Sequence, residues 1–171
     1  ELPIKKADNK QGFIDLLYPK VTFYKIGSVL FTAYGPQIID LVRKKGAKVF
    51  LDLKYHDIPN TVSHAVRNAV RLGVSMITLH TCGGIEMMKA AAESVKEESA
   101  RLKIKKPDLV GVTVLTSDKN TDNTKNIVVE RAISAMSCGL DGVVCSSQET
   151  LSVRQSCGKD FIIVTPGIRP E

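Results

Sequence analysis

The sequence predicts an α/β protein built around a parallel β-sheet. Two observations support this class: short runs rich in β-branched residues alternate with longer helix-period segments, and the short runs are almost continuously apolar. Parallel strands buried on both faces show this pattern, whereas half-exposed strands alternate apolar and polar residues. Because one strand and one helix recur at regular spacing, the chain is expected to be a series of βα units.

Six strands are expected, and each is bounded by polar residues, glycine or proline. They are rich in Val, Ile, Leu and Phe, the residues that suit a buried pleated surface. The expected strands are Val21–Ile26, Lys48–Leu53, Ser75–His80, Leu109–Val114, Gly142–Cys145 and Phe161–Val164.

Helices are expected between the strands, and a helix-like stretch, Gln11–Leu17, precedes the first one. Gly46, Gly73 and Gly139 each lie where a helix should end before the next strand, the usual place for a glycine that terminates a helix. Three apolar stripes with i, i+3, i+4 spacing indicate which faces are buried. The stripes are Val62, Ala65, Val66, Ala69 and Val70; Ile85, Met88, Ala92 and Val95; and Val128, Val129, Ala132, Ile133 and Met136.

The C-terminal ends of the expected strands decide between an open doubly wound sheet and a closed barrel. A doubly wound nucleotide-binding sheet usually carries a glycine-rich turn after its first strand, and this chain contains neither G-x-G-x-x-G nor a P-loop. A TIM (β/α)8 barrel instead builds its active site from residues at the C-terminal strand ends. We therefore predict such a barrel, because polar residues follow most strands: Lys25, Lys54 with Asp57, His80, Thr116, Ser146 and Arg169.

Residues 1–171 are expected to form a single barrel domain that is incomplete. Eight strands are needed for closure and six are visible, while the chain stops at Glu171, soon after the sixth strand. We expect the first and last strands to be missing, and the whole protein to have roughly 220–250 residues, the usual size of this barrel.

Composition excludes several classes of protein. With 43% apolar and 25% charged residues, the chain is neither disordered nor collagen-like nor a disulfide miniprotein. No apolar run approaches the ~20 residues of a membrane helix, and the N-terminus lacks the apolar core of a signal peptide. The four cysteines show no C-x-x-C pair and no metal-ligand spacing. We expect reduced thiols, a cytoplasmic location and no membrane partner.

The net charge of +6 suits an anionic partner, either nucleic acid or a phosphorylated metabolite. The strongest candidate for a nucleic-acid footprint is the basic run 103–106. It lies at the end of an expected helix, where cations complement the helix dipole, and it has no aromatic residues interleaved. We interpret it as a solvated helix end, so nucleic acid is not an expected partner.

The segment from Asp52 to Thr61 contains most of the candidate catalytic residues. In a strand alternate side chains share a face, so Asp52 and Lys54 are expected to point together into the barrel mouth. Asp57 follows in the loop, and Lys25 ends the preceding strand. We therefore expect two lysines and two carboxylates to converge on one small volume.

Such a quartet is either a structural ion-pair network or a catalytic array. Buried ion pairs are often no more stabilising than apolar packing, so four alternating charges at a barrel rim favour catalysis. A lysine beside carboxylates keeps its proton, which makes it a poor nucleophile but a good proton donor to a developing carbanion. A fixed carboxylate would also repel a substrate carboxylate and favour loss of CO₂.

The segment Phe50-Leu51-Asp52-Leu53-Lys54-Tyr55-His56-Asp57-Ile58-Pro59-Asn60-Thr61 resembles the signature of the orotidine 5′-monophosphate decarboxylase family. The D-x-K-x-x-D core is shared with related sugar-phosphate enzymes, and the D-I-P-N-T continuation favours the orotidylate branch. Further segments are similar to the family and occur in the same order: 23–27, 111–117, 139–146 and 164–170.

The resemblance implies decarboxylation of orotidine 5′-monophosphate to UMP, the last step of de novo pyrimidine synthesis, without a metal or an organic cofactor. It implies that Lys54 protonates C6 of the pyrimidine, that Asp52 crowds the departing carboxylate, and that Lys25 holds the ribose. It also implies a homodimer with shared sites, in which one loop reaches into the partner's site. In that loop Asp57 is an implied catalytic residue, and Ile58 and Thr61 are implied binding residues. The other implied binding residues are Thr116 at the pyrimidine and Arg169 at the nucleotide.

Two alternatives stay open at this point. One is a sugar-phosphate decarboxylase of the same superfamily, which would use Mg²⁺ and be sensitive to a chelator. The other is a non-catalytic barrel that binds nucleotides. The intact set of charged residues disfavours the second alternative, because burying charge is costly.

Overall fold

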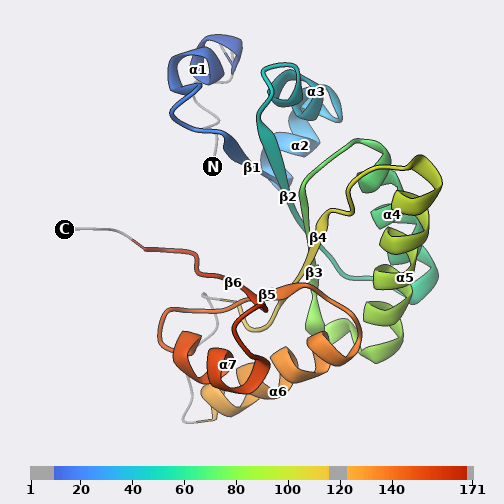
Figure 1. Ribbon diagram of the computed structural model, residues 1–171, viewed down its shortest axis with the longest axis vertical. Helices are drawn as coiled ribbons and strands as arrows, with labels where there is room; N and C mark the ends of the chain where they lie inside the picture. Colours follow the sequence, from blue (N-terminus) through green and yellow to red (C-terminus); the bar gives the residue numbers. More distant parts are fainter. Residues whose placement is uncertain (1–9, 116–122, 169–171) are drawn as a thin grey trace.

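The computed structural model describes residues 10–115 and 123–168. Its centre is a six-stranded sheet in which every neighbouring pair is parallel and the strands follow chain order. The sheet curls into a half-barrel with the helices outside it (Figure 1). The strands are β1 (Phe23–Gly27), β2 (Lys48–Tyr55), β3 (Met76–His80), β4 (Asp108–Val112), β5 (Gly142–Val144) and β6 (Ile162–Val164).

This topology confirms the barrel type of α/β fold. All six predicted strands are present, with ends that differ from the prediction by one or two residues. A doubly wound sheet reverses its strand order at a switch point, and the order β1-β2-β3-β4-β5-β6 contains no reversal. The carboxyl ends of all six strands therefore lie along one rim of the half-barrel.

Helices lie between successive strands and outside the curved sheet, whereas the first helix precedes β1 (Figure 1). Within the described ranges, no helix is long and apolar enough to cross a bilayer. The helices are α1 (Lys10–Leu17), α2 (Ser28–Tyr34), α3 (Gln37–Arg43), α4 (Pro59–Arg71), α5 (Ile85–Leu102), α6 (Thr124–Ser137) and α7 (Thr150–Cys157), with a 3-10 turn, η2 (Thr81–Gly83), after β3.

The apolar stripe predicted for α6 is too wide. Val128 and Ala132 are buried, but Ile133 and Met136 are 44% and 40% exposed. The two rows of the stripe differ by one residue, which is about 100° around a helix, so only one row can face the sheet. Ala135, which the prediction omitted, completes the buried row. Ile85 in the stripe predicted for α5 is exposed as well, because it is the first residue of that helix.

Glycine ends the helix at the predicted positions. Gly46, Gly73 and Gly139 have φ values of 77°, 70° and 86°, a left-handed conformation that other residues adopt at a cost. Gly73 has a second constraint, because a Cβ there would collide with the guanidinium of Arg43. That guanidinium donates to the carbonyl of Leu72 at 3.1 Å and so joins α3 to the end of α4.

A buried carboxylate joins α4 to α5 on the outside of the sheet. Glu98 is only 1% exposed, and its oxygens accept hydrogen bonds from Arg101 Nη2 at 2.6 Å and Arg71 Nε at 2.7 Å. The hydrogen bonds from Arg101 and Arg71 outweigh burial and hold the pKa of Glu98 at about 2. Nearby, the hydroxyls of Ser63 and Ser94 share a hydrogen bond of 2.6 Å between the same two helices.

Candidate active site

Three of the four predicted charged residues meet where β1 and β2 approach the carboxyl-end rim. Lys25 projects from β1, and Asp52 and Lys54 project from β2. One oxygen, Asp52 Oδ2, accepts a hydrogen bond from Lys54 Nζ at 2.8 Å and another from Lys25 Nζ at 3.0 Å. We refer to Lys25, Asp52 and Lys54 as the charged triad.

The backbone of β2 leaves the regular strand conformation within the triad. Leu51 pairs with Ile77 but Tyr55 pairs with Leu79, so four steps along β2 match two steps along β3. Lys54 itself has φ +52°, a left-handed conformation that is costly for a residue with a Cβ. The prediction that Asp52 and Lys54 converge is confirmed, but the regular alternation from which it was made does not hold at this point.

Thr78, on β3, supplies a side-chain acceptor for the backbone N–H of Lys54 where the β2–β3 ladder is interrupted. The backbone N–H of Lys54 donates to Thr78 Oγ1 at 2.9 Å, and the Thr78 hydroxyl donates to Asp52 Oδ1 at 3.0 Å. Thr78 is fully buried. Its hydroxyl therefore bridges the main chain of one triad residue and the side chain of another.

The electrostatics of the triad favour an ionised Asp52. Burial, which leaves this residue 8% exposed, opposes the charge. Hydrogen bonds and Coulomb attraction from Lys54 and Lys25 outweigh burial and hold the pKa of Asp52 below its ordinary value. The side chains of the two lysines are 33% and 38% exposed, so the negative centre is covered while both positive groups reach solvent.

This arrangement can deliver a proton beside a fixed negative charge. The Lys54 ammonium has three protons and is held by a carboxylate that stays ionised. A substrate atom placed at the exposed side of the ammonium would meet a proton donor, and a substrate carboxylate near Asp52 would be repelled. Both effects favour a reaction in which an anionic group leaves and a proton takes its place.

Asp57 lies outside the triad, so the predicted convergence of four charges within one chain is wrong. Its carboxylate is exposed and accepts the backbone N–H of Ile58 at 2.7 Å. This local bond turns the side chain toward the start of α4, where Pro59 is the first residue. Ile58 is 65% exposed and Thr61 is exposed as well.

Two other predicted site residues, Thr116 and Arg169, lie outside the described residues. Thr78 is the described partner of the triad that the sequence interpretation missed. One signal was present: Thr78 is a polar residue in the apolar run Met76–His80. A buried hydroxyl in such a position needs a hydrogen-bond partner, although the sequence alone does not say which one.

Two histidines and two cysteines are the neighbouring groups to compare with the triad. The rings of His56 and His80 pack with centroids 5.5 Å apart. Burial raises the pKa of the Cys145 thiol to about 11, which removes it as a nucleophile, whereas Cys82, just after β3, is exposed. Among the described residues, no three His, Cys, Asp or Glu side chains are grouped so as to hold a metal.

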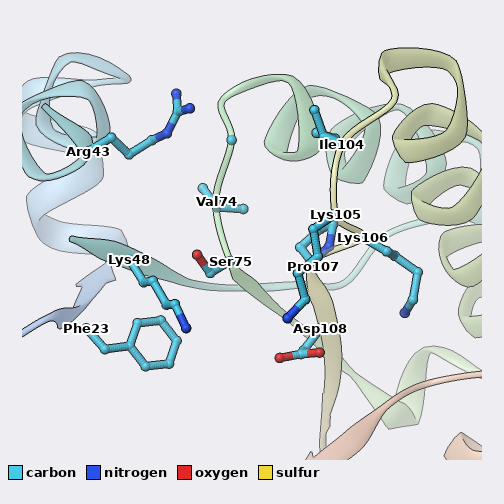
Figure 2. A pocket seen from close by; sticks show the side chains of 11 residues that line it. Phe23, Arg43, Lys48, Val74, Ser75, Ile104, Lys105, Lys106, Pro107 and Asp108 are labelled. Carbon is cyan, nitrogen blue, oxygen red and sulfur yellow. The ribbon is translucent and has the colours of Figure 1, made fainter. Parts of the chain in front are cut away.

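A hollow of about 340 Å³ lies at the opposite ends of the strands. Figure 2 shows its lining, whose basic residues are Arg43, Lys48, Lys105 and Lys106. Arg43 already bonds to the α4 terminus, and Lys106 pairs with Asp141 at 2.5 Å. Half of this basic lining is thus engaged in structural contacts, and barrel enzymes carry their chemistry at the carboxyl ends. The charged triad is the better candidate site.

A parallel sheet in chain order with a charged group near its carboxyl-end rim defines the class of (β/α)-barrel enzymes. The comparison with protein families specifies this class. The model of the Orotidine 5′-phosphate decarboxylase / HUMPS family matches residues 5–171, and the chain belongs to that family.

Individual relatives agree with the family. The chain is 44% identical over 170 residues to orotidine 5′-phosphate decarboxylase of Syntrophus aciditrophicus, a match that includes 95% of this chain and 68% of that protein. It is 47% identical over 168 residues to the Pelobacter propionicus protein of the same name, with 92% and 68% included. These relatives are carboxy-lyases by name.

Solved structures show the same architecture. A crystal structure of orotidine 5′-phosphate decarboxylase from Lactobacillus acidophilus matches with a TM-score of 0.77 and 36% identity, over 85% of this chain and 69% of that one. An uncharacterized conserved protein from Geobacillus kaustophilus matches with a TM-score of 0.84 and 35% identity, over 92% and 79%.

Proposed function

We propose that the protein decarboxylates orotidine 5′-monophosphate to UMP, and that the charged triad is its catalytic centre. The observation that carries this proposal is the shared Asp52 oxygen, which holds two lysine ammonium groups on the rim that barrel enzymes use for catalysis. The names of the relatives supply the substrate. The four free cysteines fit work in the reducing cytoplasm.

In the proposed reaction the bond between C6 of the pyrimidine and its carboxylate breaks, and CO₂ leaves. The electron pair stays on C6, and Lys54 Nζ supplies the proton that forms the new C6–H bond. Asp52 stays ionised and repels the substrate carboxylate before the bond breaks, which supports departure of CO₂. Water then returns a proton to Lys54.

The remaining binding roles are also proposals. Lys25 would hold the ribose while it pairs with Asp52. Thr116 would line the pyrimidine pocket, and Arg169 would bind the nucleotide. Binding energy from the non-reacting parts of a substrate can be used at the reacting centre, so loss of any of the three contacts is expected to lower kcat/KM, through kcat as well as KM.

We propose further that the enzyme is a homodimer with shared sites. The exposed loop with Asp57, Ile58 and Thr61 is the supporting feature, since Asp57 is separate from the triad of its own chain. An exposed isoleucine beside an exposed carboxylate suits a contact with a second copy. Asp57 would then complete the partner's site.

Mixing two inactive variants tests the shared site. Lys54→Ala and Asp57→Ala chains, after subunit exchange, would form hybrids in which one of the two sites carries both Lys54 and Asp57. Activity should recover to about a quarter of that of the wild-type sites. Each variant exchanged with itself is the control. Exchanged hybrids without any gain would exclude sharing of Asp57.

The activity itself is tested by following the ultraviolet absorbance of orotidine 5′-monophosphate with EDTA present. The proposal expects loss of substrate absorbance and formation of UMP and CO₂. No turnover of this nucleotide, together with Mg²⁺-dependent turnover of a sugar phosphate, would instead assign the chain to the sugar-phosphate enzymes of the superfamily.

A further inference from the structure

We propose that Thr78 is a positioning residue of the catalytic centre, fixing both the carboxylate of Asp52 and the main chain of Lys54. This inference rests on the proposed function for its effect on turnover, but its geometry is independent of any substrate. Thr78 lies on β3, the strand next to the one that carries Asp52 and Lys54.

Both oxygens of the Asp52 carboxylate accept hydrogen bonds. Oδ2 accepts from both lysines, at 2.8 and 3.0 Å. Oδ1 accepts from the Thr78 hydroxyl at 3.0 Å. The lysine side chains are long, flexible and one-third exposed, whereas Thr78 is fully buried and β-branched, with few rotamers. Of these three donors, Thr78 is the one that can define the plane of the carboxylate.

The backbone N–H of Lys54 also bonds to Thr78. The register shift between Leu51 and Tyr55 interrupts the ladder of β2 with β3, and a buried N–H without an acceptor is costly. The hydroxyl of Thr78 accepts this N–H at 2.9 Å. It therefore stabilises Lys54 in a left-handed conformation, φ +52°, that is costly for a residue with a Cβ.

The two bonds form a single chain, from the Lys54 N–H through the hydroxyl to the Asp52 carboxylate. The hydroxyl has one proton to donate, and donating it to Asp52 leaves its lone pair directed at the N–H. The buried Thr78 oxygen thus fixes both ends of the Lys54 side chain. It bonds to the backbone from which the side chain starts and to the carboxylate that binds the ammonium group at its tip. Small displacements of a proton donor reduce turnover strongly, so this atom is expected to matter for kcat.

Two substitutions of Thr78, by valine and by serine, distinguish the effect of its hydroxyl from the effect of its shape. Thr78→Val keeps the shape and removes both bonds, so kcat should fall about 10- to 100-fold while KM changes less than about threefold. Thr78→Ser keeps the hydroxyl and should stay within about threefold of the wild type. The matched control is Thr81→Val, which removes another buried hydroxyl, one that bonds to the Val112 carbonyl at 2.9 Å without touching the triad.

A readout independent of turnover is the hydrogen exchange of the Lys54 amide, measured by NMR in the same variants. Thr78→Val should accelerate this exchange at least about tenfold relative to the amides of Ile77 and Leu79, and Thr78→Ser should not. A wild type without turnover would overturn the proposed function, while the exchange would still test Thr78.

Three results would overturn the role of Thr78. One is a Thr78→Val enzyme with kcat within about twofold of the wild type and unchanged exchange at Lys54. Another is a serine variant as slow as the valine variant. The third is an equal loss of kcat in Thr81→Val, because the effect would then follow any buried hydroxyl near the rim.

Discussion

Two buried carboxylates of the molecule, Glu98 and Asp52, each bind two cations, and we propose a different role for each. Glu98 joins α4 to α5 on the outside of the sheet and is bound by Arg71 and Arg101. Asp52 lies on the carboxyl-end side of the sheet and is bound by Lys25 and Lys54. In both places the cations hold the pKa of the carboxyl below its ordinary value.

The difference lies in the cations and in the backbone. Guanidinium groups are planar and always charged, which suits a fixed contact between helices. Ammonium groups on flexible stems can exchange protons, which suits catalysis. The backbone near Glu98 is regular helix, whereas the backbone at Lys54 has φ +52°. A lowered carboxylate pKa alone therefore does not identify an active site; the strand-end location of Asp52 and the irregular backbone beside it are what favour it as the candidate.

Of the substitutions in the two regions, replacement of Lys54 should reduce kcat the most. In Lys54→Ala the proton donor is gone, and kcat should fall at least about 1000-fold, since acid catalysis and electrostatic stabilisation are lost together. Binding of UMP, followed by calorimetry, should stay measurable. Turnover within about tenfold of the wild type would exclude Lys54 as the donor.

Replacing Asp52 should affect turnover more than folding. Asp52→Asn removes the charge and keeps the volume, so kcat should fall about 100-fold. The two lysine side chains are one-third exposed and can turn toward water, so the urea midpoint should change little. An Asp52→Asn enzyme that loses stability but not turnover would reverse the two assignments.

Replacing Glu98 should affect folding and leave turnover unchanged. Glu98→Gln replaces a carboxylate that is 2% exposed by an amide whose NH2 group would face the donors of Arg71 and Arg101, so the midpoint of urea unfolding should fall. The neighbouring Glu97→Gln is the matched control, because Glu97 is 51% exposed in its pair with Arg67 and such pairs stabilise little. Equal midpoints for the two variants would contradict a structural role for Glu98.

The smallest expected effect is a pH dependence of the difference in urea midpoint between the wild type and Glu98→Gln. The pKa of Glu98 is lowered from 4.5 to about 2 in the folded protein, so its ionised form stabilises the fold fully above pH 4.5. This stabilisation is lost as the pH falls through 2. The gap between the urea midpoints of the wild type and Glu98→Gln should therefore narrow in acid. A gap independent of pH would exclude ionised Glu98 as its source.

Most of the fold was predictable because the strands are apolar runs bounded by polar residues, glycine or proline. The run Lys48–Leu53, for example, begins at the first residue of β2. The helix faces were less predictable, since Val129 and Ile133 are as apolar as the buried Val128 and differ from it only in their angle around α6. That angle is set by how the helix packs on the sheet.

The site was predictable only in part. The spacing of Asp52 and Lys54 correctly indicated that they meet. The register shift beside them was not predictable, because it depends on pairing with β3, which is distant in the chain. Thr78 was missed for the same reason. Asp57 was misplaced because its bond to the next N–H is a local preference of the loop, one that competes with any attraction to Lys54.

The exposed Cys82 has a practical consequence for measuring these effects. Of the chain's four cysteines, Cys138, Cys145 and Cys157 are buried and Cys82 is exposed, and burial raises the pKa values of Cys145 and Cys157. A maleimide dye reacts with accessible thiolate, so it would attach at Cys82 without any engineered cysteine. Because this residue follows β3, two positions beyond His80, the native chain offers a fluorescent reporter beside the rim where a nucleotide would bind.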